Sequence, residues 1–407
     1  MSRILFTGAS EIVTSTAATP DIVMRNAALL VENGRVSRIG PLDALAGAAD
    51  GAERVPCDGC VITPGFVDSH SHAVFGGWRA AEYAMRSRGV PYMEIARGGG
   101  GINASVRDVR ARPEEELVEL TRHRLELMSS AGTTTAEVKS GYGLETAAEL
   151  KQLRVVRALQ SVVPMTLVPT FLGAHEFPPE YRDRRDDYVD LIIHEMIPAV
   201  AAQELAVFCD VFMEPGVFDG TQTRRILEAA VAHGLVPKLH ADELENSGAA
   251  ELAAALGAAS ADHLGAISDA GIAALAHSGT VATLLPATLL FLGRTRYAPA
   301  RRLLDAGATV ALATDFNPGS APTPNMQLVL TLACSQMRMD PLEAIVAATA
   351  GGARALRLTD GTGTLAPGAP ADLVIWEIPD HRELPYRFGA APMRALWRRG
   401  ERILPRL

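Results

Sequence analysis

The feature that most constrains the fold of this chain is a repeated passage from a helical segment, through a glycine, into a β-rich run. It occurs at Gly132, Gly234, Gly279 and Gly307. Glycine fits the left-handed position that closes a helix. The runs that follow are largely apolar, which is typical of strands buried on both faces of a sheet. The pattern therefore predicts helices that alternate with parallel strands.

Eight such strands are expected, at residues 62–67, 133–138, 165–170, 210–213, 236–240, 260–263, 280–285 and 310–314. Helix-forming sequence separates them: residues 115–128 carry apolar side chains at helical spacing, and residues 221–233 begin with Thr221, a capping residue type. Eight βα units predict a (β/α)₈ TIM barrel. An open doubly wound sheet is the alternative, but no Gly-x-Gly-x-x-Gly follows the first strand, so the barrel is favoured.

The two ends of the chain have a different pattern. Residues 4–61 contain short strand-like runs and the hairpin signal Asn33-Gly34. Residues 371–376 and 395–400 repeat this style. We therefore expect one small β-sandwich built from both ends, with residues 1–62 plus 356–407 forming it and residues 63–355 forming the barrel.

Charge and cysteine content exclude several classes of function. With 38 Lys plus Arg against 47 Asp plus Glu, the net charge of −9 argues against a surface that binds nucleic-acid phosphates. Cys57 and Cys60 form a lone Cys-x-x-Cys without the second pair or βαβ context that a zinc or redox site needs. The N-terminus lacks a signal-peptide apolar region, and no apolar run is long enough to span a membrane. We expect a cytoplasmic protein that acts on a small molecule.

Polar residues follow several of the expected strands, where barrel enzymes build their active sites. His70 and His72 come after the first strand, His240 and His263 close the fifth and sixth, and Asp315 follows the eighth. The His-x-His pair alone is equally consistent with two surface histidines in a turn. Together, however, the nitrogens of His70, His72 and His240 and an oxygen of Asp315 match a catalytic zinc or iron site with an open position for water.

A metal ion in such a site lowers the pKa of its bound water toward about 7 and polarises a carbonyl or amidine. Glu243, three residues beyond His240, is the expected proton shuttle, and Asp315 can accept a proton as well as bind the ion. His263 can polarise the substrate oxygen. The alternative for Glu243 is a carboxylate that stabilises a helix N-terminus.

The run Pro-Gly-Phe-Val-Asp-Ser-His-Ser-His at residues 64–72, followed by His240, His263 and Asp315, resembles the metal-dependent amidohydrolase superfamily. Residues 74–79, 92–102, 137–144, 168–176 and 314–320 resemble a branch of it that acts in histidine degradation. This resemblance implies hydrolysis of the cyclic amide 4-imidazolone-5-propanoate to N-formimidoyl-L-glutamate, by attack of a metal-bound hydroxide. It also implies one Zn²⁺ or Fe³⁺ per chain and a homodimer.

The matching motifs assign roles to further residues. They imply substrate contacts from Arg79, Tyr92, Tyr142, His175 and Glu243, with Asn317, Gly319 and Ser320 at the glutamate end of the product. A planar guanidinium such as that of Arg79 is the usual bidentate partner of a carboxylate, here the substrate's propionate.

Three positions depart from the family pattern. Trp78 stands where the family often has a small or acidic residue, and Ser320 where threonine is frequent. Glu243 is glutamine in some relatives, so its carboxylate is not indispensable by resemblance alone.

Two-metal members of the superfamily use a carboxylated lysine on strand four, and residues 210–214 contain no lysine. We therefore predict a mononuclear site.

Two alternatives stay open at this point. A nucleobase or related deaminase also suits the His-x-x-Glu after strand five, because its chemistry attacks a carbon that bears an amino group. A catalytically silent relative that keeps the barrel is the other. All four expected ligands are present, which disfavours the silent relative.

Overall fold

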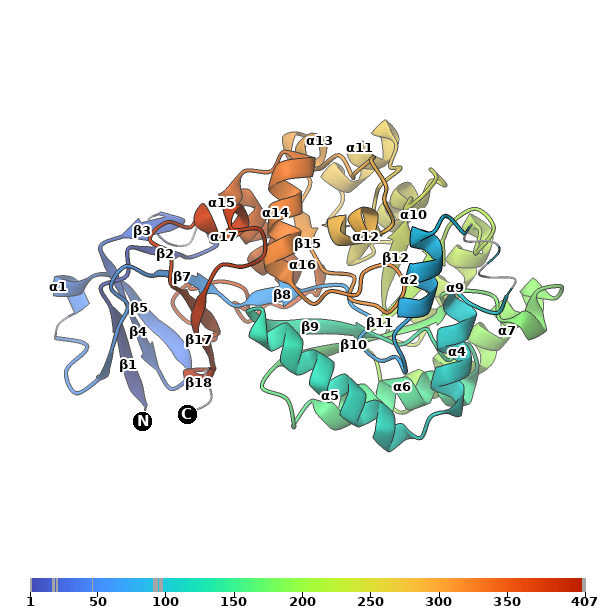
Figure 1. The fold of residues 1–407 in the computed structure, drawn as a ribbon, viewed down its shortest axis with the longest axis horizontal. Coiled ribbons are helices and arrows are strands. Elements are labelled where there is room, and N and C mark those ends of the chain that lie inside the picture. Colours follow the sequence, from blue (N-terminus) through green and yellow to red (C-terminus); the bar gives the residue numbers. More distant parts are fainter. Residues whose placement is uncertain are drawn as a thin grey trace.

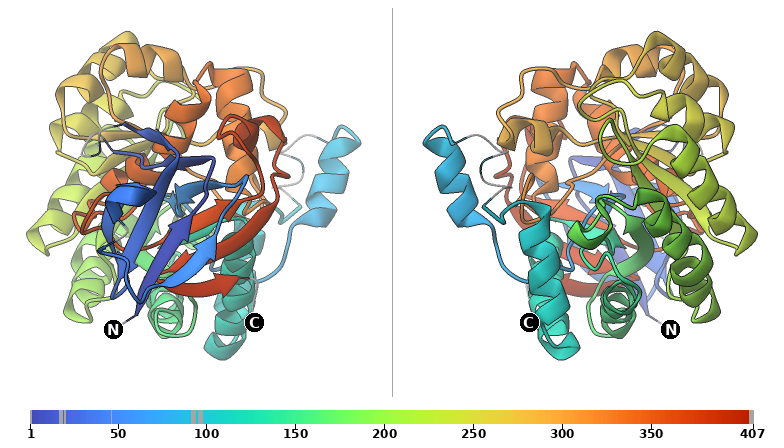
Figure 2. Two further views of the ribbon diagram at one scale, coloured as in Figure 1. Left: turned by 90° about the vertical axis from the view of Figure 1, so that its left-hand side faces the viewer. Right: turned by 90° about the vertical axis from the view of Figure 1, so that its right-hand side faces the viewer.

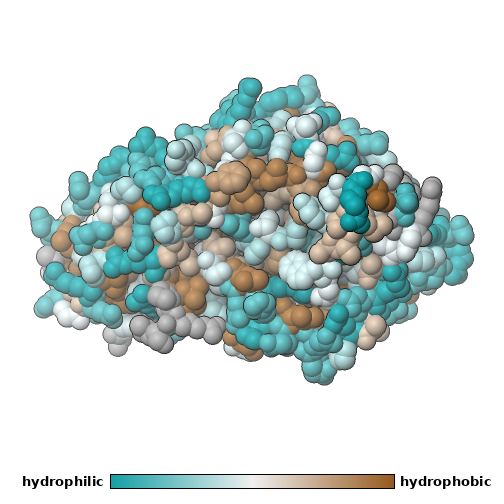
Figure 3. Space-filling view, in the orientation of Figure 1, coloured by the Kyte–Doolittle hydropathy of each residue, from teal (hydrophilic) through white to brown (hydrophobic). Residues whose placement is uncertain are grey.

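The computed structural model describes residues 2–16, 19, 21–45, 47–90, 94 and 98–404. An eight-stranded barrel lies beside a smaller body made of two sheets, which contains the ends of the described chain (Figure 1). No helix within the described ranges is long and apolar enough to cross a membrane. In the face shown in Figure 3, hydrophilic side chains cover most of the periphery and hydrophobic ones gather in smaller patches toward the middle.

The barrel strands pair in sequence order and in parallel. They are β8 (Phe66–Asp68), β9 (Thr133–Lys139), β10 (Thr166–Ala174), β11 (Phe208–Met213), β12 (Val236–Ala241), β13 (Ser260–His263), β14 (Val281–Leu284) and β15 (Val310–Leu312). Just beyond the first and last strands, the His72 N–H donates to Phe316 O and the Asp315 N–H donates to His70 O, at 2.9 and 3.0 Å. These bonds close the barrel at its carboxyl end, and the predicted (β/α)₈ fold is confirmed.

Helices follow the strands, and most of them cover the outside of the barrel; the first, at residues 80–87, has no buried side chain and stands away from it (Figures 1 and 2). They are α2 (Ala80–Ser87), α4 (Ile102–Ala111), α5 (Glu114–Ser130), α6 (Thr146–Leu159), α7 (Arg185–Leu191), α8 (Ile197–Ala202), α9 (Gly220–Ala232), α10 (Ala249–Ala255), α11 (Asp269–His277), α12 (Pro286–Phe291), α13 (Ala300–Asp305), α14 (Met326–Met337), α15 (Pro341–Val346) and α16 (Gly352–Ala355). The helix expected at residues 221–233 is α9, but its N-cap is Asp219 rather than Thr221. Asp219 forms a capping box with Gln222: its side chain accepts the Gln222 N–H, and the Gln222 side chain accepts the Asp219 N–H.

The apolar run at residues 62–67 is divided between two sheets, contrary to the single barrel strand that we expected. Its first part forms β7 (Val61–Pro64), which pairs with β16 (Leu373–Trp376) outside the barrel, and only β8 belongs to the barrel. Gly65 lies between them and donates its N–H to Asp372 O. A Cβ at Gly65 would overlap the side chain of Thr134, so glycine permits the close passage from one sheet to the other.

The smaller body is a sandwich of two sheets. One sheet holds β1 (Arg3–Thr7), β4 (Ala27–Glu32), β5 (Arg35–Pro41) and β6 (Glu53–Pro56). The other holds β2 (Glu11–Val13), β3 (Val23–Arg25), β7, β16, β17 (Met393–Arg398) and β18 (Glu401–Leu404). Two short helices connect these strands. Helix α1 (Leu42–Leu45) lies between β5 and β6, and α17 (Glu383–Tyr386) lies between β16 and β17.

Both ends of the chain contribute to the sandwich, as expected. The left view of Figure 2 shows the blue and red strands side by side. Buried side chains from both sheets form one cluster, in which the rings of Phe6 and Trp397 meet edge to face at 5.2 Å. Burial of apolar surface between the sheets explains why residues so distant in sequence fold together.

Candidate active site

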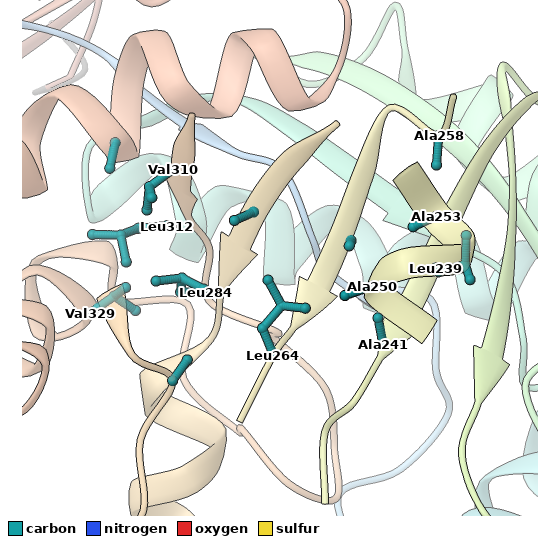
Figure 4. Close-up of a cluster of buried hydrophobic side chains, with 14 of the residues drawn as sticks. Leu239, Ala241, Ala250, Ala253, Ala258, Leu264, Leu284, Val310, Leu312 and Val329 are labelled. Carbon is teal, nitrogen blue, oxygen red and sulfur yellow. The ribbon is translucent and has the colours of Figure 1, made fainter. Parts of the chain in front are cut away.

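The alternation of side chains along the barrel strands decides which residues face its interior. On β12, Leu239 and Ala241 pack outward with Ala250 and Ala253 of α10 (Figure 4). Successive residues of a strand point to opposite faces, so His240 between them faces the interior. The same geometry applies at the ends of the other strands, and it gathers polar side chains at one mouth of the barrel.

Five side chains named from the sequence meet there, and each is at most 6% exposed. They are His70, His72, His240, His263 and Asp315. The Nε2 atoms of His70 and His72 lie 3.2 Å apart, and Asp315 Oδ1 is 3.6 Å from the first and 3.4 Å from the second. Candidate ligand atoms of His70, His240 and His263 also lie within 4.8 Å of one another.

Carboxylates lie behind two rings of the cluster, and Asp262 fixes the orientation of the His70 ring by a hydrogen bond. His70 Nδ1 is 2.6 Å from Asp262 Oδ2, and His240 Nδ1 is 2.9 Å from Asp210 Oδ2. A ring that donates Nδ1–H to a carboxylate leaves the lone pair of Nε2 free to bind a cation. Burial lowers the pKa of His70 well below its usual range and that of His240 to about 4, so both imidazoles are neutral, the form that binds metals.

Two further observations fit a bound cation. His263 Nε2 is buried and has no hydrogen-bond partner within the described ranges, as expected of an atom that faces a ligand. His263 and Asp315 have φ of +82° and +54°, a left-handed conformation that is uncommon for such residues. Strained backbone of this kind concentrates at functional sites. The donor set of imidazoles and one carboxylate suits zinc or iron.

A network of buried charges lies beneath the cluster, and the sequence-based interpretation missed it. Lys139 Nζ lies 2.8 Å from both Glu137 and Asp210, and Lys238 Nζ lies 2.9 Å from Glu137. Lys139 and Lys238 also approach Asp262, at 3.8 and 3.6 Å. All five side chains are 0% exposed. Their signal was present in the sequence as charges at alternate positions of otherwise buried strands.

A cavity of about 740 Å³ opens above the cluster and contains the other predicted residues. Its lining includes Arg79, Tyr142, His175, Glu243, Asn317, Gly319 and Ser320, together with four of the five clustered side chains. Tyr92 lies outside the described residues. Arg86, Arg294, Glu176, Phe212 and Glu214 also line the cavity and were not predicted. Arg86 and Arg294 lie in segments that carry no motif, so nothing local in the sequence marked them.

Arg79 is held at the rim with its guanidinium over a glycine. It is the N-cap of α2, and its Nε donates to Glu82 Oε2 at 3.1 Å. A Cβ at Gly319 would overlap the Arg79 guanidinium, so only glycine leaves room for it there. Asn317 Oδ1 accepts the N–H groups of Gly319 and Ser320, both at 2.8 Å, and so shapes this turn.

Aromatic rings form one wall beside the cluster. The His175 ring stacks on that of His72 with centroids 5.2 Å apart and an interplanar angle of 17°. His175 Nδ1 lies 2.9 Å from Gly141 O, and the Tyr142 ring lies 5.5 Å from the His175 ring. Tyr142 and His175 therefore present a phenol and an imidazole to whatever binds beside His72.

Two carboxylates at the site have pKa values shifted in opposite directions. Burial raises the pKa of Glu243, whose Oε2 lies 3.8 Å from His263 Nδ1. Burial also opposes ionisation of Asp315, but hydrogen bonding with His72 and the nearby charge of His263 lower its pKa to about 2. Thr288 adds a hydrogen bond to Asp315 Oδ2 at 2.6 Å. Two pKa values separated in this way suit a site in which Glu243 carries a proton and Asp315 stays ionised.

A barrel whose carboxyl end holds four histidines and an aspartate defines a hydrolase of the amidohydrolase class. The amidohydrolase family profile matches residues 61–404, and the chain belongs to that family, whose members are metal-dependent. An adenosine deaminase from Xanthomonas campestris, solved with bound zinc, has a similar fold, with a TM-score of 0.72 at 20% identity over 98% of this chain and 92% of that chain.

Sequence relatives show to which branch of the amidohydrolase family the chain belongs. An imidazolonepropionase of Symbiobacterium thermophilum is 46% identical over 98% of this chain and 97% of its own length. One of Myxococcus xanthus is 49% identical over 91% of this chain and 88% of its own length. Within the amidohydrolases, the chain belongs to the imidazolonepropionase family and is a hydrolytic enzyme.

Proposed function

We propose that the cavity binds 4-imidazolone-5-propanoate and that the chain hydrolyses its ring to N-formimidoyl-L-glutamate. The observation that carries this proposal is the meeting, in one cavity, of the Arg79 guanidinium with the histidine and aspartate cluster. An anionic tail and a hydrolysable ring amide are the two features of the substrate that these groups recognise. Membership of the imidazolonepropionase family supports the same substrate.

One metal ion, Zn²⁺ or Fe³⁺, would be held by His70, His72, His240 and Asp315. When bound, it would supply water acidified enough to attack at neutral pH and charge stabilisation for the amide oxygen. The Lys139 ammonium is paired with two carboxylates. It is therefore not available as a carbamate that would bridge a second ion, which supports a mononuclear site.

The chain's own residues divide the proton transfers. Asp315, which its lowered pKa keeps ionised, accepts a proton from the attacking water, which a bound metal ion would acidify. Glu243, with its raised pKa, delivers a proton to the ring nitrogen as the carbon–nitrogen bond breaks. His263 donates toward the amide oxygen, which gains negative charge in the transition state. Water thus adds across the bond, and the products are a carboxylate and an amidine.

The remaining residues bind and orient the substrate. Arg79 pairs with the propionate, and Tyr142 and His175 hydrogen-bond the ring from the wall beside His72. After ring opening, a second carboxylate is present. Asn317, Gly319 and Ser320 then hold the glutamate end of the product through the turn that Asn317 shapes.

The deciding experiment follows the disappearance of 4-imidazolone-5-propanoate by absorbance, with the purified enzyme, after chelator treatment, and after metal is restored. Turnover that is lost with chelator and recovered with zinc or iron is expected. Ammonia release from guanine or cytosine, without turnover of the imidazolone, would instead establish the deaminase alternative. Absence of turnover in fully metal-loaded enzyme would refute the proposal.

The cellular location, the oligomeric state and the division into domains belong to the same proposal. The enzyme works in the cytoplasm. It is a homodimer, and light scattering of the purified protein tests this oligomeric state. Residues 1–62 with 356–407 form one domain and residues 63–355 the other, except that Thr63 and Pro64 pair with β16 of the sandwich.

A further inference from the structure

The loop that follows β9 is held by side chains of a single helix. Residues 141–144 read Gly-Tyr-Gly-Leu, and their four N–H groups all donate to α6. The Glu149 carboxylate accepts from Gly141, Gly143 and Leu144 at 3.0, 2.7 and 2.8 Å. Gln152 Oε1 accepts from Tyr142 at 3.0 Å. Both acceptor residues are 0% exposed.

These contacts hold a backbone that would not adopt its conformation unaided. Gly141 and Leu144 have φ of +107° and +50°. The left-handed region costs a residue with a Cβ about 1 kcal/mol or more, so the Leu144 conformation needs compensation. A Cβ at Gly143 would lie 2.6 Å from the backbone carbon of Ala148, so the loop is pressed directly against the first turns of α6.

The clamped loop carries two of the groups proposed to bind the substrate. Tyr142 belongs to the loop and lines the cavity. Gly141 supplies the carbonyl that lies 2.9 Å from His175 Nδ1, and this contact orients the imidazole stacked on His72. Glu149 itself is absent from the cavity lining. Any effect of Glu149 on the substrate therefore passes through the loop.

We infer that Glu149 is a positioning residue for substrate binding: its carboxylate captures three N–H groups of the 141–144 loop and thereby places the Tyr142 hydroxyl and the His175 ring. This inference rests on the proposed substrate contacts of Tyr142 and His175. A carboxylate is required because its two oxygens offer several lone pairs to convergent donors. Glutamine offers one oxygen and turns an NH₂ group toward an N–H.

Glu149→Gln tests the clamp directly. Amide hydrogen exchange of the peptide that contains residues 141–144 should become faster, because at least one captured N–H loses its acceptor. KM should rise about tenfold or more, the loss expected for a charge-assisted hydrogen bond, while bound metal stays at the wild-type level. The control is Glu251→Gln on α10, where a partly buried carboxylate accepts from Ser268 at 2.7 Å, away from the cavity. This control should leave the amide exchange of residues 141–144, KM and the bound metal unchanged.

A double-mutant cycle with Tyr142→Phe separates positioning from general destabilisation. If Glu149 acts through the loop, the KM effects of Glu149→Gln and Tyr142→Phe are not additive. Fully additive effects, or faster exchange with an unchanged KM, would overturn the inference. An unchanged KM in Tyr142→Phe alone would contradict the proposed phenol contact, whereas the exchange measurement still reports on the clamp.

Gly143→Ala provides a second route if Glu149→Gln does not fold. The added methyl group would lie 2.6 Å from the Ala148 backbone carbon and 2.9 Å from Glu149 Oε1, so it displaces the loop from α6 while the carboxylate itself stays in the chain. The same rise in KM with unchanged metal content is expected. Wild-type KM in a folded Gly143→Ala enzyme would refute the idea that the position of this loop controls substrate binding.

Discussion

Removal of the Arg79 guanidinium should weaken substrate binding by an amount that the structure allows to be estimated. Nε of Arg79 is already engaged by Glu82 at 3.1 Å, so the two terminal nitrogens remain for the substrate's carboxylate. The side chain is only 15% exposed, which limits screening by water. A hydrogen bond between charged groups is worth about 1.5–3 kcal/mol. Loss of the forked pair by Arg79→Ala should cost about 2–3 kcal/mol, or about 30- to 150-fold in KM.

The assay is steady-state absorbance with 4-imidazolone-5-propanoate, accompanied by metal analysis. Arg79→Ala should raise KM and leave kcat and metal content close to wild type, because Arg79 is not placed at the reacting atoms. Arg79→Lys keeps the charge but loses the fork, so an intermediate rise is expected. Arg88→Ala removes the same charge from the exposed end of α2 and should have no effect.

An imidazolone without the propionate supplies the refutation. This compound has no carboxylate to pair with Arg79, so wild type and Arg79→Ala should bind and turn it over equally poorly. If Arg79→Ala impairs the truncated compound as much as the full substrate, the guanidinium acts on something other than the propionate. An unchanged KM for the full substrate would also contradict the assignment.

Asp315→Asn should fold, bind metal less tightly and lose most turnover, as judged by circular dichroism, metal analysis and kcat; retained turnover would remove its proton-accepting role. Glu243→Gln should lower kcat by less than about a hundredfold, at the low end for general acid–base groups, and complete loss would show that the carboxylate is essential. Elemental analysis should give one tightly bound ion per chain, and two would contradict the mononuclear site. Burial alone would raise the pKa of Glu11, but hydrogen bonds from His381 and Arg25 outweigh it and lower that pKa. Its stabilisation is therefore present above pH about 4.3 and is lost as pH falls through the lowered pKa. The melting-temperature gap between wild type and Glu11→Gln should narrow on acidification, and a constant gap would refute this.

The positions of the barrel strands were predictable because they depend on local pattern. Glycines at helix ends and apolar runs are signals that span only a few residues. Strands β9, β12 and β13 begin at the residues expected from these signals. The placement of His240 and His263 at strand ends followed from the same pattern. Strand ends of a closed parallel barrel meet at one mouth, so the cluster could be anticipated without any long-range contact being known.

What escaped prediction depends on partners distant in the chain. Nothing within residues 62–67 shows that β7 pairs with β16, some 310 residues later, because an apolar run fits either sheet. The capping box of Asp219 was missed for a different reason. Several capping residue types stand together there, and only the backbone geometry selects one of them.

The buried lysines show how a global property of a sequence can mislead about its interior. A net charge of −9 disfavours a surface that binds nucleic acid, yet Lys139 and Lys238 lie fully buried among carboxylates, and the cavity above them is lined by three arginines. A buried charge persists only when it is paired, so each lysine inside a barrel strand requires an acidic partner on a neighbouring strand. That requirement follows from electrostatics alone and applies to any barrel strand that carries a lysine. Charged residues at alternate positions of adjacent apolar strands therefore predict a paired charge network inside the barrel, and in this chain that network lies beneath the histidine cluster.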